Sequence, residues 1–336
     1  MAEKNTLNFL LVSDLKNTNN ALILIYQIEA FHSSVPYKIH IIVDTQSTKK
    51  NIISKITIPT GQIQFYVFNE FENYIPSNLM IEKNNVSRIA YSKIFSPLII
   101  PNTISKIVYL DTDILIVRPL TPLFDFNFDN SLAACQGASD EQLSGEKLSF
   151  NSGVMVLNLD KMRNSWDWEF IIKSFQDNTF SRWMDTTILR RLYGSDWYEI
   201  PTSFNFIING KSQKYFQSSD LSVIHFAGRP KPWDTTSDSI FDYLWRFVDY
   251  AVNSLQKKND LILDWTTDSF LYQQLNSLYH AILSGRPIIS PHRIGSVLEA
   301  TRTELEATRT ELEAIIGSTI WRVFKPYRSI LKIIQR

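Results

Sequence analysis

The chain of 336 residues has little cysteine and no excess of either charge. Its single cysteine, Cys135, excludes an internal disulfide and is typical of a reducing compartment. Lysine plus arginine and aspartate plus glutamate both number 34, so no overall field favours nucleic acid as a partner. No apolar run approaches the roughly 20 residues that span a bilayer. The first apolar run, LNFLLV before Ser13, is too short for a signal peptide. We therefore expect a cytoplasmic protein.

The chain does contain apolar segments of strand length that alternate with helical ones. Strands are predicted at residues 7–12, 37–43, 63–68 and 105–110, and helices at residues 20–33 and 85–100. Short apolar strands separated by helices predict an α/β fold with a doubly wound, mostly parallel sheet. In such sheets, ligands bind at the carboxyl ends of the strands.

Two aspartates follow the strand predicted at 105–110, in the stretch IVYLDTDILIV (residues 107–117). In an extended segment residues i and i+2 face the same side, so Asp111 and Asp113 are expected to converge. Converging carboxylates repel each other unless a cation lies between them, and hard oxygen ligands suit Mg²⁺ or Mn²⁺. The alternative is a turn that ends the strand with an aspartate cap, because Asp-x-Asp alone is a weak signal.

The stretch LSVIHFAGRPKPW (residues 221–233) is a strand that ends in a histidine and a loop. His225 offers a neutral imidazole ligand at the end of another strand. In the loop, Gly228 would let the backbone approach a ligand, and Lys231 would neutralise a phosphate. The alternative for His225 is a structural residue held by hydrogen bonds.

A third stretch, FNSGVMVLNLDKMR (residues 150–163), places Asn151 and Gly153 directly before another buried strand. Asn-x-Gly can be a simple turn. It can also present an amide to a polar ligand beside a glycine that leaves room for that ligand.

Together these stretches resemble glycosyltransferase family 8, the retaining GT-A enzymes that include glycogenin and bacterial lipopolysaccharide galactosyl- and glucosyltransferases. The resemblance covers about residues 6–235 and includes SRIAYSKIFSPLI, KIVYLDTDILIVRPLTPLFD, FNSGVMVLNLDKMR, DTTILRRLYG and HFAGRPKPW. The last stretch matches the family's His-x-x-Gly-x-x-Lys-Pro-Trp pattern at every fixed position. The resemblance implies a GT-A fold and a UDP-sugar donor.

The resemblance also implies a metal and phosphate site. Asp111 and Asp113 match the metal-binding Asp-x-Asp of the family, and His225 matches its third protein ligand. The ion would be Mn²⁺, or Mg²⁺, with the diphosphate of the donor completing its shell. Gly228 and Lys231 match the phosphate contacts.

Further residues match positions around the donor. Asn151 and Gly153 match the donor-sugar contacts, and Asp14 falls where the family binds the uracil and ribose. Lys93 occupies a position that is usually arginine and touches the donor. Asp185 matches a carboxylate that the family keeps beside the sugar, although it could instead cap the helix predicted after it. The resemblance thus gives Asp185, Asn151 and Lys93 as catalytic residues.

The chain departs from its relatives at two places. Many lipopolysaccharide transferases have glutamine and aspartate where this chain has Thr186 and Thr187. Loss of that glutamine argues against a covalent intermediate there and favours attack from the face that UDP leaves. Lys16 and Asn17 replace a tyrosine that frequently follows Asp14, which weakens the predicted base contact.

The implied function is transfer of glucose or galactose, with retention, from a UDP-sugar to a bacterial surface glycan. Lipopolysaccharide or a lipid-linked oligosaccharide would be the acceptor. Three alternatives remain: a glycogenin-like self-glycosylating protein, a non-catalytic UDP-sugar-binding scaffold, and a nucleotidyltransferase. The histidine loop argues against the nucleotidyltransferase.

The predicted domain organisation is a transferase domain over residues 1–235, followed by appended segments. Residues 236–285 are expected to form a helical extension that packs on the domain, and residues 286–297 a linker. Residues 298–316 contain the repeat LEATRTE, which favours either a coiled coil that makes a homo-oligomer or a solvated spacer helix.

The last residues, 317–336, are basic and amphipathic. They carry Trp321 and no acidic residue, a pattern typical of a membrane-surface anchor. The segment 318–336 also resembles the tails of bacterial cell-surface-polysaccharide glycosyltransferases, which implies a peripheral position on the inner face of the cytoplasmic membrane. The alternative is a tail helix that covers an apolar patch of the same domain.

Overall fold

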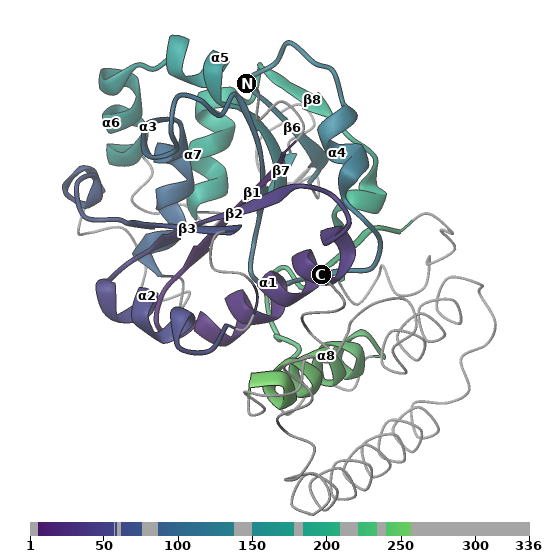
Figure 1. The fold of residues 1–336 in the computed structure, drawn as a ribbon. Helices are drawn as coiled ribbons and strands as arrows, with labels where there is room; N and C mark the ends of the chain where they lie inside the picture. Colours follow the sequence, from purple (N-terminus) through teal and green to yellow (C-terminus); the bar gives the residue numbers. More distant parts are fainter. Residues whose placement is uncertain are drawn as a thin grey trace, which may run out of the picture.

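The computed structural model describes residues 6–56, 58, 62–75, 87–137, 150–177, 184–208, 221–233 and 240–256. These residues form a seven-stranded sheet, a smaller three-stranded sheet and the helices around them (Figure 1). The larger sheet has the strand order β3-β2-β1-β4-β7-β6-β8, and the smaller one the order β5-β10-β9.

The strands of the larger sheet are β1 (Leu7–Ser13), β2 (Tyr37–Val43), β3 (Ile63–Val67), β4 (Lys106–Leu110), β6 (Leu132–Gln136), β7 (Phe150–Asn158) and β8 (Trp197–Glu199). The smaller sheet contains β5 (Ile114–Ile116), β9 (Phe206–Ile207) and β10 (Val223–His225). The α-helices are α1 (Thr18–His32), α2 (Gln46–Ile53), α3 (Ser96–Ile99), α4 (Thr121–Asp125), α5 (Leu159–Asn164), α6 (Trp168–Gln176), α7 (Met184–Tyr193) and α8 (Ile240–Gln256). Three 3₁₀ segments are η2 (Glu72–Tyr74), η4 (Arg88–Phe95) and η5 (Thr202–Phe204).

The larger sheet is mostly parallel. Strand β1 pairs in parallel with β2 and β4, and β3 pairs in parallel with β2. Strand β7 runs antiparallel to both of its neighbours, β4 and β6, while β6 and β8 are parallel. The predicted doubly wound, mostly parallel α/β fold is confirmed, with β7 as its reversed strand.

Both faces of the inner strands β1, β2, β4 and β7 are covered, which explains why these strands are mostly apolar. Alternate residues of each strand enter different cores, since successive side chains point to opposite faces. On β1, Phe9 and Leu11 pack with α1 residues, whereas Leu10 and Val12 pack with residues of η4. The two cores hold the sheet rigidly, so the loops at its carboxyl edge have a fixed base.

Helix α8 packs against α1 and belongs to the core on that side (Figure 1). Its buried apolar residues recur at helical spacing and form one face: Phe241, Leu244, Trp245, Val248 and Val252. Asn19 of α1 donates a hydrogen bond to Asp249 of α8 (2.6 Å).

The remaining predictions about the C-terminal part lie outside the described residues. These are the rest of the helical extension, the linker at 286–297, the repeat at 298–316 and the basic tail at 317–336. The domain boundaries therefore stay predictions. Among the helices that the structure describes, none has both the length and the apolar character needed to span a membrane.

Candidate metal and donor site

The two aspartates of the Asp-x-Asp motif lie in a turn that joins the two sheets. The backbone N–H of Asp111 donates to Gly153 (2.8 Å) and so continues the pairing of β4 with β7. The carbonyl of Asp113 accepts from Phe226 (3.0 Å) and so begins the pairing of β5 with β10. The expectation of one extended segment is wrong here, because Thr112 lies in a turn between sheets. The two carboxylates converge nonetheless.

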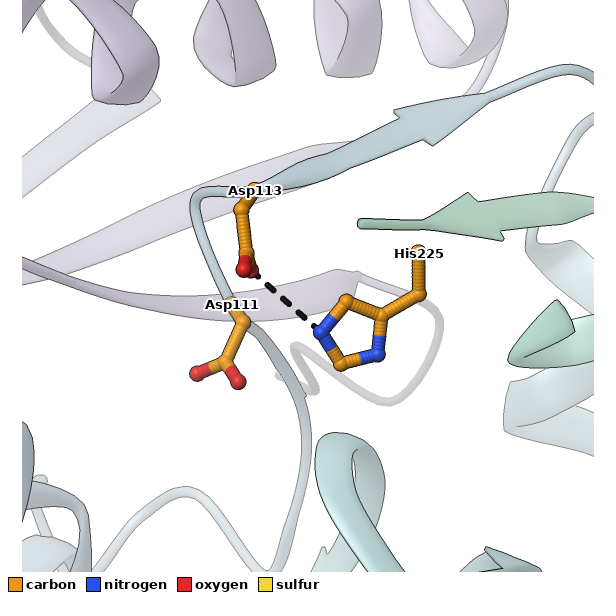
Figure 2. Close-up of side chains that lie close together, drawn as sticks. All are labelled: Asp111, Asp113 and His225. Carbon is orange, nitrogen blue, oxygen red and sulfur yellow. Dashed lines mark ion pairs between the residues drawn. The ribbon is translucent and has the colours of Figure 1, made fainter. Parts of the chain in front are cut away.

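His225 completes a cluster with these aspartates (Figure 2). Each of the three side chains offers one ligand atom, and these atoms lie within 4.8 Å of one another. Nε2 of His225 is 3.4 Å from Oδ1 of Asp113. Two carboxylate oxygens and an imidazole nitrogen form a donor set that fits a divalent cation such as Mn²⁺.

Gly153 of β7 makes room for the imidazole of His225. A Cβ atom at this position would lie 2.2 Å from Cε1 of the ring, far inside van der Waals contact. The space that glycine was expected to leave for a ligand is therefore filled by the histidine. The contact of Gly153 with the donor sugar stays a prediction.

Lys231 lies on the other side of Asp113. Its Nζ donates hydrogen bonds to Oδ2 of Asp113 and to the carbonyl of Phe226 (2.8 Å). Burial would raise the pKa of Asp113, but Lys231 and His225 beside it hold that pKa well below its usual range. Gly228 has φ = +82°, and a Cβ added there would meet open space, so the loop needs glycine for its backbone conformation and not for room.

Lys93 joins the cluster to Asp185. Its side chain is 2% exposed, and its Nζ lies 3.0 Å from Oδ1 of Asp111 and 2.8 Å from Oδ2 of Asp185. Burial alone would lower the pKa of Lys93, but the two carboxylates outweigh burial and hold the pKa well above its usual range. Asp185 is the second residue of α7 and is ion-paired, rather than the residue that precedes the helix.

Asn151 and Asn205 connect β7 to the histidine. Oδ1 of Asn151 accepts from the backbone N–H of Gly153 (2.9 Å) and from Nδ2 of Asn205 (2.8 Å). Oδ1 of Asn205 lies 2.8 Å from Nδ1 of His225. The sequence had suggested that Asn151 lies before the strand, but the structure places it inside β7. Asn205, which is 3% exposed, was missed because a lone asparagine in SFNF carries no spacing signal.

Asp14 lies at the carboxyl end of β1, which neighbours β4 in the sheet. Its Oδ1 accepts from the backbone N–H and from the side-chain amide of Asn17 (2.8 and 2.9 Å). The aspartate thus orders the turn that leads into α1. Its contact with the nucleotide stays a prediction.

Chains of known structure share this fold. LgtC, described as a galactosyltransferase in complex with donor and acceptor sugar analogues, superposes with a TM-score of 0.61 at 19% identity, over 77% of this chain and 98% of LgtC. The structure of glycosyltransferase GlyE of Streptococcus pneumoniae TIGR4 gives a TM-score of 0.56 at 17% identity, over 85% of this chain and 66% of that one. The fold is therefore that of a GT-A glycosyltransferase.

The sequence comparison gives the family. The model of the family described as "Glycosyl transferase family 8" matches residues 10–237. The chain belongs to glycosyltransferase family 8, as its motifs had predicted. Glycosyltransferase GlyB of Streptococcus pneumoniae serotype 4 is 29% identical in an alignment of 177 residues that covers 48% of this chain and 42% of GlyB. The chain thus spans less than half of that relative's length.

Proposed function

We propose that this protein transfers a hexose, glucose or galactose, from a UDP-sugar to a glycan with retention of anomeric configuration. The observation that carries the proposal is the convergence of Asp111, Asp113 and His225 between two buried or half-buried lysines. The cluster lies where β4 ends, as expected for ligand binding in open α/β sheets. Membership of glycosyltransferase family 8 supports glycosyl transfer as the reaction.

Asp111, Asp113 and His225 would hold the divalent cation, Mn²⁺ or Mg²⁺. When bound, such a cation offsets the negative charge of the diphosphate as the bond to the sugar breaks. The donor set fits this role, because the low pKa of Asp113 keeps its carboxylate ionised at neutral pH. His225 adds a ligand without adding negative charge.

Lys231 would bind the diphosphate. Its ammonium group lies at the edge of the cluster, with the carbonyl of Phe226 and Oδ2 of Asp113 as its partners. A fixed positive charge at this point stabilises the charge that develops on the leaving UDP. Gly228, with its positive φ, shapes the loop that places Lys231 there.

Asp185 and Lys93 would lie beside the sugar. The sugar passes through an oxocarbenium-like state, which a nearby carboxylate stabilises. Lys93 fixes Asp185 by an ion pair of 2.8 Å, and Thr186 is tied to Ser152 by a hydrogen bond of 2.6 Å. Neither feature prepares a free nucleophile, so we favour attack by the acceptor on the face that UDP leaves. The leaving phosphate would take the acceptor's proton.

A bacterial surface glycan is the acceptor that we propose, either lipopolysaccharide or a lipid-linked oligosaccharide. LgtC has been crystallised with an acceptor sugar analogue, and GlyB is a glycosyltransferase of a bacterium. The basic tail at residues 318–336 would bring the site to a membrane surface, where a lipid-linked acceptor lies.

The test is release of UDP from a panel of UDP-sugars in the presence of Mn²⁺. The wild type should slowly hydrolyse one donor, and both Asp113→Ala and His225→Ala should abolish that release. Asp177→Ala is a matched control, since Asp177 is an exposed carboxylate whose partner is Arg191. Release that survives Asp113→Ala and His225→Ala would contradict the proposal.

The same samples separate the alternatives. Mass spectrometry of the protein after incubation with donor would show added hexose if it glycosylates itself, as glycogenin-like proteins do. Binding of UDP and Mn²⁺ without release of UDP from a UDP-sugar in the presence of any acceptor would favour a scaffold. Release of pyrophosphate instead of UDP would indicate a nucleotidyltransferase.

A further inference from the structure

The hydrogen bonds around Asn205 determine which nitrogen of His225 carries a proton, and so which one can direct a lone pair toward Asp111 and Asp113. The series of hydrogen bonds begins at the backbone N–H of Gly153, a group that can donate but cannot accept. This N–H donates to the side chain of Asn151 at 2.9 Å, so the atom of Asn151 that faces it must be the oxygen. The orientation of the Asn151 amide is therefore fixed by the backbone of β7.

The orientation of Asn205 follows from that of Asn151. Oδ1 of Asn151 can only accept, and the nearest atom of Asn205 lies 2.8 Å from it. That atom must be the amide nitrogen, because two amide oxygens at this distance would repel each other. The oxygen of Asn205 consequently faces Nδ1 of His225, also at 2.8 Å.

An amide oxygen accepts but cannot donate, so Nδ1 of His225 must carry a proton. This holds for the neutral ring and for the charged one. In the neutral ring the lone pair is then on Nε2, which is the nitrogen that faces Asp113 at 3.4 Å. The lone pair of the neutral ring is thus directed toward the two aspartates, where a cation would bind (Figure 2).

The surroundings leave the ring few other choices. Asn205 and His225 are each 3% exposed, so water cannot replace a missing partner cheaply. The absent side chain of Gly153 lets the imidazole lie directly against β7. The backbone N–H of Asn205 donates to the carbonyl of Thr202 (3.0 Å), which anchors the asparagine to η5.

We propose that Asn205, which is itself oriented by Asn151, is a positioning residue for the metal site and fixes the tautomer of His225 so that Nε2 is the ligand atom. This inference depends on the proposed function, because it assumes that the cluster binds a divalent cation. Groups that orient a metal-ligating histidine contribute about 10- to 100-fold to metal affinity.

The first measurement is calorimetric titration of the full chain with Mn²⁺. Asn205→Leu should weaken Mn²⁺ binding about 10- to 100-fold. Asn8→Leu is the matched control, since Asn8 bonds Nε2 of the buried His40 at 3.1 Å, on two strands of the larger sheet. This control breaks an Asn–His hydrogen bond outside the cluster and should leave Mn²⁺ affinity unchanged. Thermal unfolding of each variant shows that it is folded.

The second measurement is nitrogen NMR of histidine-labelled, metal-free protein, with His225 assigned by comparison with His225→Ala. The wild type should show a proton on Nδ1 of His225. In Asn205→Leu that proton should exchange faster or move to Nε2. A purely structural role for Asn205 would not change which nitrogen carries the proton.

The outcomes separate this inference from the proposed function. A bare Nδ1 in the wild type, or Mn²⁺ binding by Asn205→Leu within about threefold of wild type while His225→Ala loses it, would overturn the role of Asn205 alone. If Asp113→Ala and His225→Ala bind Mn²⁺ as the wild type does, or the wild type does not bind it, the metal site fails and both proposals fail with it.

Discussion

At the scale of single residues, Lys93 is the least exposed of the ionisable side chains in the site. It is 2% exposed and holds Asp111 and Asp185, which are 28% and 13% exposed. Replacing it with methionine keeps most of the length of the unbranched side chain but leaves two half-buried carboxylates without their shared cation. We expect Lys93→Met to lower the free energy of unfolding by about 3 kcal/mol. Urea unfolding in EDTA measures this loss.

The pH dependence of that loss follows from the raised pKa of Lys93. The stabilisation is fully present below the ordinary lysine pKa of about 10.4 and fades only as the pH rises toward the higher folded-state value. The difference between wild type and Lys93→Met should therefore be constant between about pH 6 and 9. Lys161→Met is the control, because Lys161 and Asp196 are 40% and 34% exposed and their pair should contribute less than about 1 kcal/mol. Equal losses in the two variants would contradict this account of Lys93.

Residues in motifs could be found from the sequence, and residues held only by tertiary contacts could not. Asp111, Asp113 and His225 stand at strand ends in patterns of fixed spacing, and they converge in the structure. Asn205 lies 54 positions from Asn151 and 20 from His225, so no local pattern joins them. The double ion pair of Lys93 likewise depends on how η4 packs against β4 and α7, which the sequence alone does not reveal.

At the scale of elements, Arg163 of α5 fixes the segment that leads into β4. Its guanidinium donates to four backbone carbonyls at 2.8 to 3.2 Å: those of Pro97, Ile100, Pro101 and Ile104. Some of these carbonyls lie at the end of α3, where the helix offers no further backbone N–H groups as partners. Arg163→Met should lower the free energy of unfolding by about 2–3 kcal/mol, as measured by urea unfolding.

A lysine at this position should recover only part of that loss. It keeps the charge but lacks the planar fork that reaches several carbonyls at once. Arg191→Met serves as the control, since Arg191 pairs with Asp177 at the surface, where the two side chains are 38% and 48% exposed. That substitution should cost less than about 1 kcal/mol. An Arg163→Lys variant as stable as the wild type would show that the fork geometry is unimportant.

The sequence predicted which segments form elements better than it predicted how they pair. Apolar strand segments at 37–43 and 105–110 match β2 and β4 closely. The direction of β7 was not predictable, because a fully buried strand is apolar in either direction. The turn at Thr112 was also missed, since the run ILIV after Asp113 continues the apolar pattern although β5 pairs in another sheet.

At the scale of the whole molecule, α8 links the C-terminal part of the described chain to the site. Trp245 is 1% exposed, and its ring packs against Phe226 and Trp233 at centroid distances of 5.4 and 5.2 Å. Arg246 donates a hydrogen bond to the carbonyl of Pro232 (3.2 Å). The loop from Phe226 to Trp233 carries Lys231, so the contacts of α8 with this loop help to hold the proposed phosphate-binding lysine in place. The sequence predicted a helix here but gave no sign of this role.

Loss of that support should affect ligand binding as well as stability. Trp245→Ala should lower the free energy of unfolding by about 3–5 kcal/mol and, because the loop loses its base, weaken UDP binding in the presence of Mn²⁺. Val252→Ala is the matched control on the same buried face of α8, where no described contact reaches the loop. It should cost about 2 kcal/mol and leave UDP affinity unchanged. Urea unfolding and calorimetry with UDP measure the two effects.

If Trp245→Ala does not fold, Trp245→Phe carries the test with a smaller cavity. A variant at Trp245 that is destabilised but binds UDP like Val252→Ala would show that α8 stabilises the domain without supporting the site.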